Sequence, residues 1–188
     1  MSELGVKSMN AVKIRIARAA IMCAAALITP QLAGQELWST TKYGFQVGVL
    51  LPAGDDLKAV AETGLGVSGY LEQMWSNGWA IRGRLEYTYF GEKEIDSGLK
   101  VNINQTGAML DVVYYSRNTS LYPFAGIGYF TRSAERTYAA GRKEDLELFS
   151  QFAVTLGGGW NFTNHLGVEI KYSICESSWA QVSLLYRF

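Results

Sequence analysis

The sequence predicts an all-β fold, an eight-stranded antiparallel up-and-down transmembrane β-barrel preceded by a cleavable signal peptide. Three features predict it. Apolar and polar residues alternate with a period of two in stretch after stretch from about residue 40 onward, the pattern of strands with one apolar face. The connections between these stretches largely alternate between tight turns and longer polar segments, as in barrels that cross a membrane. The chain opens with a basic and then apolar segment typical of exported proteins.

The alternating stretches are 43–49, 65–72, 79–89, 101–115, 121–131, 148–160, 166–174 and 179–188. The last is the most regular, and its apolar parity ends on Phe188. Its length suffices for a tilted strand to span a bilayer, which takes about 9–11 residues. The stretch 121–131 is apolar on both parities, so its inward face stays open. The alternation in 101–115 is less regular, and a β-bulge near Gly107 would explain this.

Residues 1–34 have the parts of a secretory signal peptide. Four basic residues and one acidic residue precede an apolar run over 19–29, and small residues end the segment. The alternative is a membrane anchor, which is weaker because a spanning helix needs about 20 apolar residues. Met9 is an alternative start, since residues 9–34 form a complete signal by themselves. The predicted domains are therefore a signal peptide over 1–34 and a barrel over 35–188.

Charge and cysteine content exclude two further features. The chain has 17 basic and 17 acidic residues, and a mild acidic excess remains once the signal is removed. A nucleic-acid partner is therefore not expected. Of the two cysteines only Cys175 lies after the signal, so no intrachain disulfide can form.

The connections are of two kinds. Tight turns are expected near Asn77, Asn118 and Thr163, and long polar loops over 91–98 and 132–147. The connection after the first strand is expected to hold a short helix over 55–62, capped by one of the two aspartates at its start. Short turns on one side and long loops on the other place both chain ends on the periplasmic side of such a barrel.

The apolar parity is expected to face outward, into the membrane. The polar parity combines charged residues with many glycines, which suits a narrow lumen better than a solvated outer surface. Aromatic residues lie near strand ends on the apolar parity, as in the girdles of membrane barrels. These aromatic residues are Trp79, Tyr87, Tyr89, Trp160, Tyr172, Tyr186 and Phe188. The alternative is a soluble periplasmic barrel of the lipocalin kind, with the apolar parity inside around a ligand.

The chain's last residues carry a resemblance to a known family. Tyr186-Arg187-Phe188, behind alternating apolar residues, resembles the terminal signal of Gram-negative outer-membrane barrels. Residues 40–188 resemble the small eight-stranded proteins of the OmpA, OmpX and OmpW kind. The resemblance implies a place in the cell outer membrane and contact with its lipid and lipopolysaccharide. It also implies an assembly signal that the barrel-assembly machinery reads, formed by Val182, Leu184, Tyr186 and Phe188. A monomer is expected.

Catalytic, cofactor and metal sites are not expected. Some eight-stranded barrels act on lipid A with a serine placed two residues after a histidine on one strand. Here His165 is followed at that position by Gly167, and then by Glu169, so the nucleophile is missing. His165 is expected in a turn at the periplasmic rim. The adjacent Asp55 and Asp56 indicate a helix cap rather than a metal site.

The first tight hairpin is expected to bring charged residues into the lumen. Centring it on Asn77 places Glu72 opposite Arg82 and Tyr70 opposite Arg84, all on the polar parity.

The last hairpin is expected to add to them. Centring it near Ser177 places Gly167 opposite Arg187 and Lys171 opposite Ser183. Four basic and four acidic residues would then share the interior, and buried charges must be paired. The expected lumen charge cluster is Glu72, Arg82, Arg84, Glu86, Asp111, Glu169, Lys171 and Arg187.

The sequence thus predicts a non-enzymatic barrel with a plugged polar lumen, acting structurally or through its extracellular loops in envelope integrity, adhesion or binding. Eight strands enclose an interior about wide enough for side chains to fill, which favours this function. The alternative from another class is a narrow channel for small or apolar solutes, as the OmpW-like resemblance implies.

Overall fold

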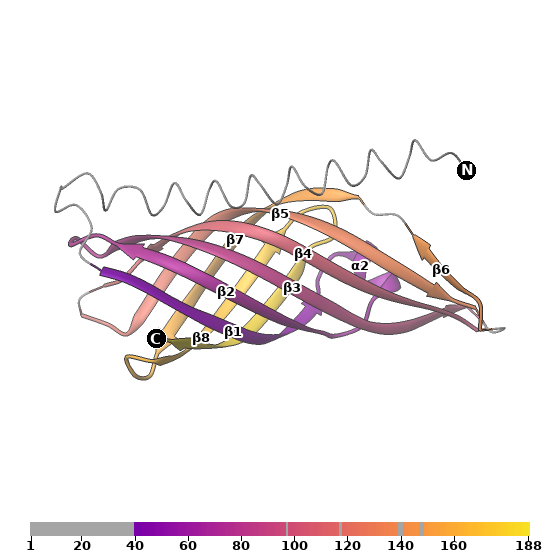
Figure 1. The fold of residues 1–188 in the computed structure, drawn as a ribbon, viewed down its shortest axis with the longest axis horizontal. Coiled ribbons are helices and arrows are strands. Elements are labelled where there is room, and N and C mark those ends of the chain that lie inside the picture. Colours follow the sequence, from indigo (N-terminus) through magenta and orange to yellow (C-terminus); the bar gives the residue numbers. More distant parts are fainter. Residues whose placement is uncertain (1–39, 97, 117, 139–140, 147–148) are drawn as a thin grey trace. The chain divides into compact units, whose positions relative to one another are not determined.

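The computed structural model describes residues 40–188, except 97, 117, 139–140 and 147–148. The predicted signal peptide lies outside the described residues. The elements, coloured along the chain in Figure 1, are β1 (Thr40–Pro52), α2 (Asp55–Val60), β2 (Gly64–Met74), β3 (Trp79–Asp96), β4 (Leu99–Tyr114), β5 (Leu121–Thr137), β6 (Lys143–Leu146), β7 (Ser150–Asn161), β8 (Leu166–Ile174) and β9 (Trp179–Arg187). No helix in this part of the chain is long and apolar enough to span a membrane.

The strands close into a barrel. They are hydrogen-bonded in the order β4-β3-β2-β1-β9-β8-β7-β5, and a further pairing of β4 with β5 completes the ring. Each of these pairings is antiparallel. Among the described residues the barrel wall therefore has eight strands, which confirms the predicted fold class. The short β6 pairs with the end of β5 beyond the wall.

The apolar parity faces outward, as predicted. Phe152 is 76% exposed and Leu65 62%, whereas Gln46 and Arg82 on the other parity are buried. The aromatic residues assigned to the girdles are all among the exposed large hydrophobic residues. A lipocalin-like interior is therefore wrong for this chain.

The facing of β5, which the sequence leaves open, follows from the glycines of its neighbours. Tyr122 and Phe124 point into the barrel, where a Cβ atom on Gly159 or Gly157 of β7 would overlap their rings. Figure 1 shows β5 and β7 side by side, and their register pairs Phe124 with Gly157.

No bulge occurs at Gly107. The ladder between β3 and β4 is continuous from Trp79 to Phe90, and its irregularities lie further on, between Phe90 and Asp96. Gly107 instead leaves room for the ring of Phe130, which would overlap a Cβ atom there. The alternation in β4 is irregular because the lumen itself is partly apolar at Val101 and Ile103.

Two predicted loops are largely strand. β3 continues to Asp96 and β4 begins at Leu99. β5 continues to Thr137, and β6 pairs antiparallel with its last residues. Beyond the apolar band neither face of these strands needs to be apolar, so the alternation that marks a strand is lost. Exposed ion pairs such as Lys100–Glu92, at 2.8 Å, lie there instead.

The helix α2 ends at Val60 rather than at residue 62, and neither aspartate caps it. The N-cap is Gly54, without a side-chain hydrogen bond, and Asp55 and Asp56 occupy the first turn. Acidic groups are favourable there because the helix dipole is positive at its start. The backbone amide of Gly54 donates to the carbonyl oxygen of Ser178 at 3.0 Å, which ties the helix to the β8–β9 turn.

The β8–β9 hairpin has a register other than the predicted one. Gly167 pairs with Leu185 and Lys171 with Gln181, a shift of two residues along β9. The hydroxyl of Ser178 donates to the carbonyl of Cys175 at 2.9 Å and accepts from its amide at 3.2 Å. These two bonds close the turn one position earlier than the sequence suggests.

Candidate functional site

The lumen contains two layers of side chains. One is a charge layer, formed by Glu72, Arg82, Arg84, Glu86, Asp111, Glu169 and Lys171. The other is an apolar layer, formed by Leu50, Leu57, Ala61, Phe90, Val101, Ile103, Met109, Phe130, Ala153 and Trp179. Strand alternation places the strand residues of both sets inside, since every second residue of each strand points to the lumen.

Arg82 is the centre of the charge layer. It is fully buried and opposite Glu72, the expected register, with Nε donating to that carboxylate at 2.8 Å. Its Nη1 donates to Glu169 on β8, and its Nη2 donates to the hydroxyl of Tyr115 at 2.8 Å. One guanidinium therefore connects β2 and β3 to the far side of the barrel.

Arg84 repeats this arrangement one step along β3. It forms ion pairs with Asp111 on β4 and, at 3.1 Å, with Glu169. Asp111 pairs with Arg82 in the strand register, but its carboxylate binds Arg84. Glu169 thus holds both arginines, and replacing it would leave two buried cations short of a partner.

Lys171 and Glu86 form a separate pair. Both are buried and in contact across the lumen, from β8 and β3. The ammonium group also lies 3.6 Å from the sulfur of Met109, a residue of the apolar layer. This pair therefore marks the boundary between the two layers.

Arg187 is not in the place predicted for it. The two-residue shift in register puts Leu185, instead of Arg187, opposite Gly167. Arg187 donates to the hydroxyl of Tyr115 at 3.0 Å and lies over the rings of Tyr115 and Tyr122. Among the described residues no carboxylate is within ion-pair distance of it, so cation–π contacts take that place.

Three uncharged residues of this site escape the sequence analysis. Gln46 donates to Glu169 and accepts from Arg84 at 3.0 Å. Tyr122 donates to Glu169 at 2.7 Å, and Tyr115 donates to Glu72 at 2.8 Å. Gln46 lies on the polar parity of its strand and could have been found, whereas Tyr122 lies on the strand whose facing the sequence leaves open.

The apolar layer closes the lumen beside the charge layer. Leu57 and Ala61 enter it from the α2 segment, and the rings of Phe130 and Trp179 meet edge to face at 5.0 Å. Arg132 lies over the Trp179 ring and donates to Gln105 at 2.7 Å and to a carbonyl of the β8–β9 turn. Partial burial raises the pKa of the Cys175 thiol in that turn.

The predicted assembly-signal residues Val182, Leu184, Tyr186 and Phe188 form an outward row. Across the seam with β1, Phe188 stacks on Tyr43 at 5.2 Å and Tyr186 stacks on Phe45 at 5.5 Å. The amide of Phe188 donates to the carbonyl of Tyr43 at 3.0 Å. The two ends of the barrel sheet are therefore joined by aromatic contacts as well as by the ladder.

His165 lies in the exposed turn between β7 and β8, with Nδ1 3.0 Å from the carbonyl oxygen of Arg187. Glu169, further along β8, has its carboxylate engaged by the two arginines. The described residues contain no group of His, Cys, Asp or Glu that could hold a metal ion.

Comparison with known proteins agrees with this geometry. The family model described as "Outer membrane protein beta-barrel domain" matches residues 19–178. Ail, the attachment invasion locus protein of Yersinia pestis, solved in complex with the heparin analogue sucrose octasulfate, is similar over 80% of this chain and 100% of its own, at 13% identity and a TM-score of 0.59. Neisserial surface protein A is similar over 79% of this chain and 96% of its own, at 11% identity and a TM-score of 0.52. At these identities the two structures support the fold alone. No curated protein matches the chain.

Proposed function

This chain belongs to the outer-membrane β-barrel family, and from that premise we propose that it is a closed, non-enzymatic barrel that acts through its surface. The observation that carries the proposal is the lumen. Arg82 and Arg84 are buried and bound to carboxylates from other strands, and the apolar layer lies beside them. The side chains of both layers are almost fully buried.

The experiment that tests closure is conductance of the purified barrel in planar lipid bilayers. The wild type should give no steady open-channel current, because ions could pass only if the buried ion pairs of the charge layer separated, which costs several kcal/mol. A steady current would favour the alternative, a narrow channel for small or apolar solutes.

The segments that connect the strands at the end of the barrel with α2 and the long hairpins are acidic. Segments 53–63, 91–100, 133–149 and 175–178 contain eleven acidic and six basic residues. Ail was solved with a polysulfated heparin analogue, but an acidic surface repels such a ligand. For this chain we propose a cationic partner, so binding to an immobilised polylysine peptide should exceed binding to heparin at low salt.

We further propose that the β2–β3, β4–β5 and β7–β8 turns and the C-terminus face the periplasm. The long β3–β4 and β5–β6 hairpins then lie outside the cell. The wall contacts outer-membrane lipid and lipopolysaccharide, the outward row of β9 is the signal for the barrel-assembly machinery, and the protein is a monomer. The terminal aromatic residue on a regular outward row supports the assembly role.

A further inference from the structure

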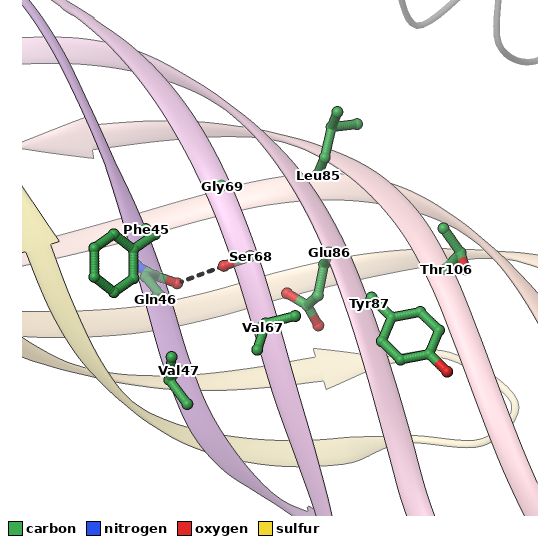
Figure 2. A pocket seen from close by; sticks show the side chains of 10 residues that line it. All are labelled: Phe45, Gln46, Val47, Val67, Ser68, Gly69, Leu85, Glu86, Tyr87 and Thr106. Carbon is green, nitrogen blue, oxygen red and sulfur yellow. Dashed lines mark hydrogen bonds between the residues drawn. The ribbon is translucent and has the colours of Figure 1, made fainter.

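The outer surface of β1, β2 and β3 has a hollow at Gly69. The register pairs Gly69 with Phe45 on one side and with Leu85 on the other. A Cβ atom added to Gly69 would meet no heavy atom within 4 Å. The cavity has a volume of about 450 Å³, and Figure 2 shows Gly69 on β2 between the side chains of these two neighbours.

The backbone does not require glycine at this position. Among the described residues a positive φ occurs at Gly78, Gly98 and Gly141, and Gly69 is not among them. No neighbouring atom requires glycine there either. At Gly48, in contrast, a Cβ atom would overlap atoms of the neighbouring strand β9. The effect of glycine at position 69 is therefore on the outer surface, where the absence of a side chain leaves the hollow.

The hollow is lined by hydrocarbon. Phe45, Val47, Val67, Leu85 and Tyr87 surround it and are all exposed on the outer surface. Two of the polar side chains nearby are engaged in the lumen: the hydroxyl of Ser68 donates to Gln46 at 3.2 Å, and Glu86 pairs with Lys171. On the outer surface the lining adds the uncharged Thr106, and the hydroxyl of Tyr87 donates to Asn104 at 3.0 Å. The outward lining is therefore mostly apolar and uncharged, which suits a hydrocarbon chain.

The hollow is continuous with the surface that faces the membrane. Phe45, at its edge, lies two residues from Tyr43, which stacks on Phe188 at the chain's end. Gly69 itself lies midway along β2. In the orientation proposed above, on which this step rests, an acyl chain from the periplasmic leaflet reaches the hollow from its Phe45 edge. The lipid of that leaflet is phospholipid.

A second copy of the barrel fits the hollow poorly. Two apolar faces gain no hydrophobic stabilisation from meeting inside a membrane. They associate instead through close contact of small residues or through hydrogen bonds between polar side chains. Here Phe45 and Leu85 stand on either side of one glycine and are 47% and 62% exposed. They keep a rigid wall away from Gly69, whereas a flexible chain can lie between them.

We propose that the hollow at Gly69 binds one phospholipid acyl chain and retains it longer than the rest of the outer surface retains lipid. Dispersion contacts on several sides of the chain, instead of one, supply the preference. The wall thus has a defined lipid site.

Native mass spectrometry of the purified barrel with palmitoyl-oleoyl phosphatidylethanolamine tests the proposal. The wild type should retain one phospholipid, and G69L, which fills the hollow, should lose it. G158L is the matched control, because Gly158 is also a strand glycine with room for a Cβ atom, 3.5 Å from its nearest neighbour, and is no part of the hollow. It should retain the lipid. Equal retention in wild type and G69L would overturn the proposal, as would displacement by lipopolysaccharide alone.

A measurement on the wild type keeps the test valid if G69L does not fold. A phospholipid with a photoactivatable acyl chain, in vesicles of the same lipid, should label the tryptic peptide 59–82 more than the peptide 172–187. Even labelling of the two spanning peptides counts against the site.

Disulfide-linked dimers of G69C in a Cys175→Ser background would assign the hollow to a second copy and overturn the lipid site. Vesicles with identical leaflets make these results independent of the orientation proposed above.

Discussion

Arg82 and Glu169 form an ion pair across the lumen although they lie 87 residues apart in the chain. Glu169 also accepts from Arg84, Gln46 and Tyr122. Apart from the Lys171–Glu86 pair, the charge layer is therefore one hydrogen-bonded network and not a set of separate cross-strand pairs. Such a network forms only when the barrel closes, because its members come from β1, β3, β5 and β8.

Arg82→Leu should lower the free energy of unfolding by about 3 kcal/mol or more, because it leaves Glu72 and Glu169 buried without their common cation. Combining it with Glu72→Leu should cost less than the sum of the single changes, since the two residues share an interaction. Urea unfolding in lipid vesicles measures this cycle. Lys100→Leu is the control: its ion pair with Glu92 is exposed, so it should cost about 0–1 kcal/mol. Strictly additive losses would contradict the network.

Phe188→Asp should leave export intact and reduce the amount of folded protein in the outer membrane. The change removes the last residue of the outward row on β9 and its stacking on Tyr43. Fractionation of the envelope, with unboiled and boiled samples compared on a gel, measures the folded barrel. Phe162→Asp is the control. It changes another exposed aromatic residue, which lies in the β7–β8 turn and contacts Trp160, and this variant should assemble. Normal assembly of Phe188→Asp would remove the assembly role.

An epitope inserted at Gly141 should be labelled on intact cells. Gly141 lies between β5 and β6 with open space around it and a φ of 76°, and insertions in exposed loops are well tolerated. The same epitope at Asn164, in the β7–β8 turn, should be labelled only after permeabilisation. The reverse pattern would invert the proposed orientation.

The sequence predicts best where a feature is local. The turn at Asn77 and Gly78 fixes the β2–β3 register, and so the pairing of Glu72 with Arg82, because Gly78 takes a φ of 90° and the Asn77 side chain accepts from Trp79. In the last hairpin the register depends on a side chain, since Ser178 closes the turn by its hydroxyl.

Features that depend on a neighbouring strand could not be predicted from the sequence. The inward facing of Tyr122 follows from space left by Gly159, which is far along the chain but adjacent in the sheet. The strand extensions past Phe90 escape prediction for another reason. Outside the membrane no solvent difference between the two faces imposes alternation.

The fit of rings to glycines inside the wall gives the last prediction. Gly107→Ala should lower the free energy of unfolding by about 1–3 kcal/mol, because the added methyl group overlaps the ring of Phe130, which is buried against Trp179. Adding Phe130→Leu should recover part of the loss, since a smaller side chain leaves room for the methyl group. Gly69→Ala is the control, where the methyl group meets open space, and should change the unfolding free energy little or raise it. If Gly107→Ala and Gly69→Ala were equally stable in urea, ring packing would not be what requires glycine at 107.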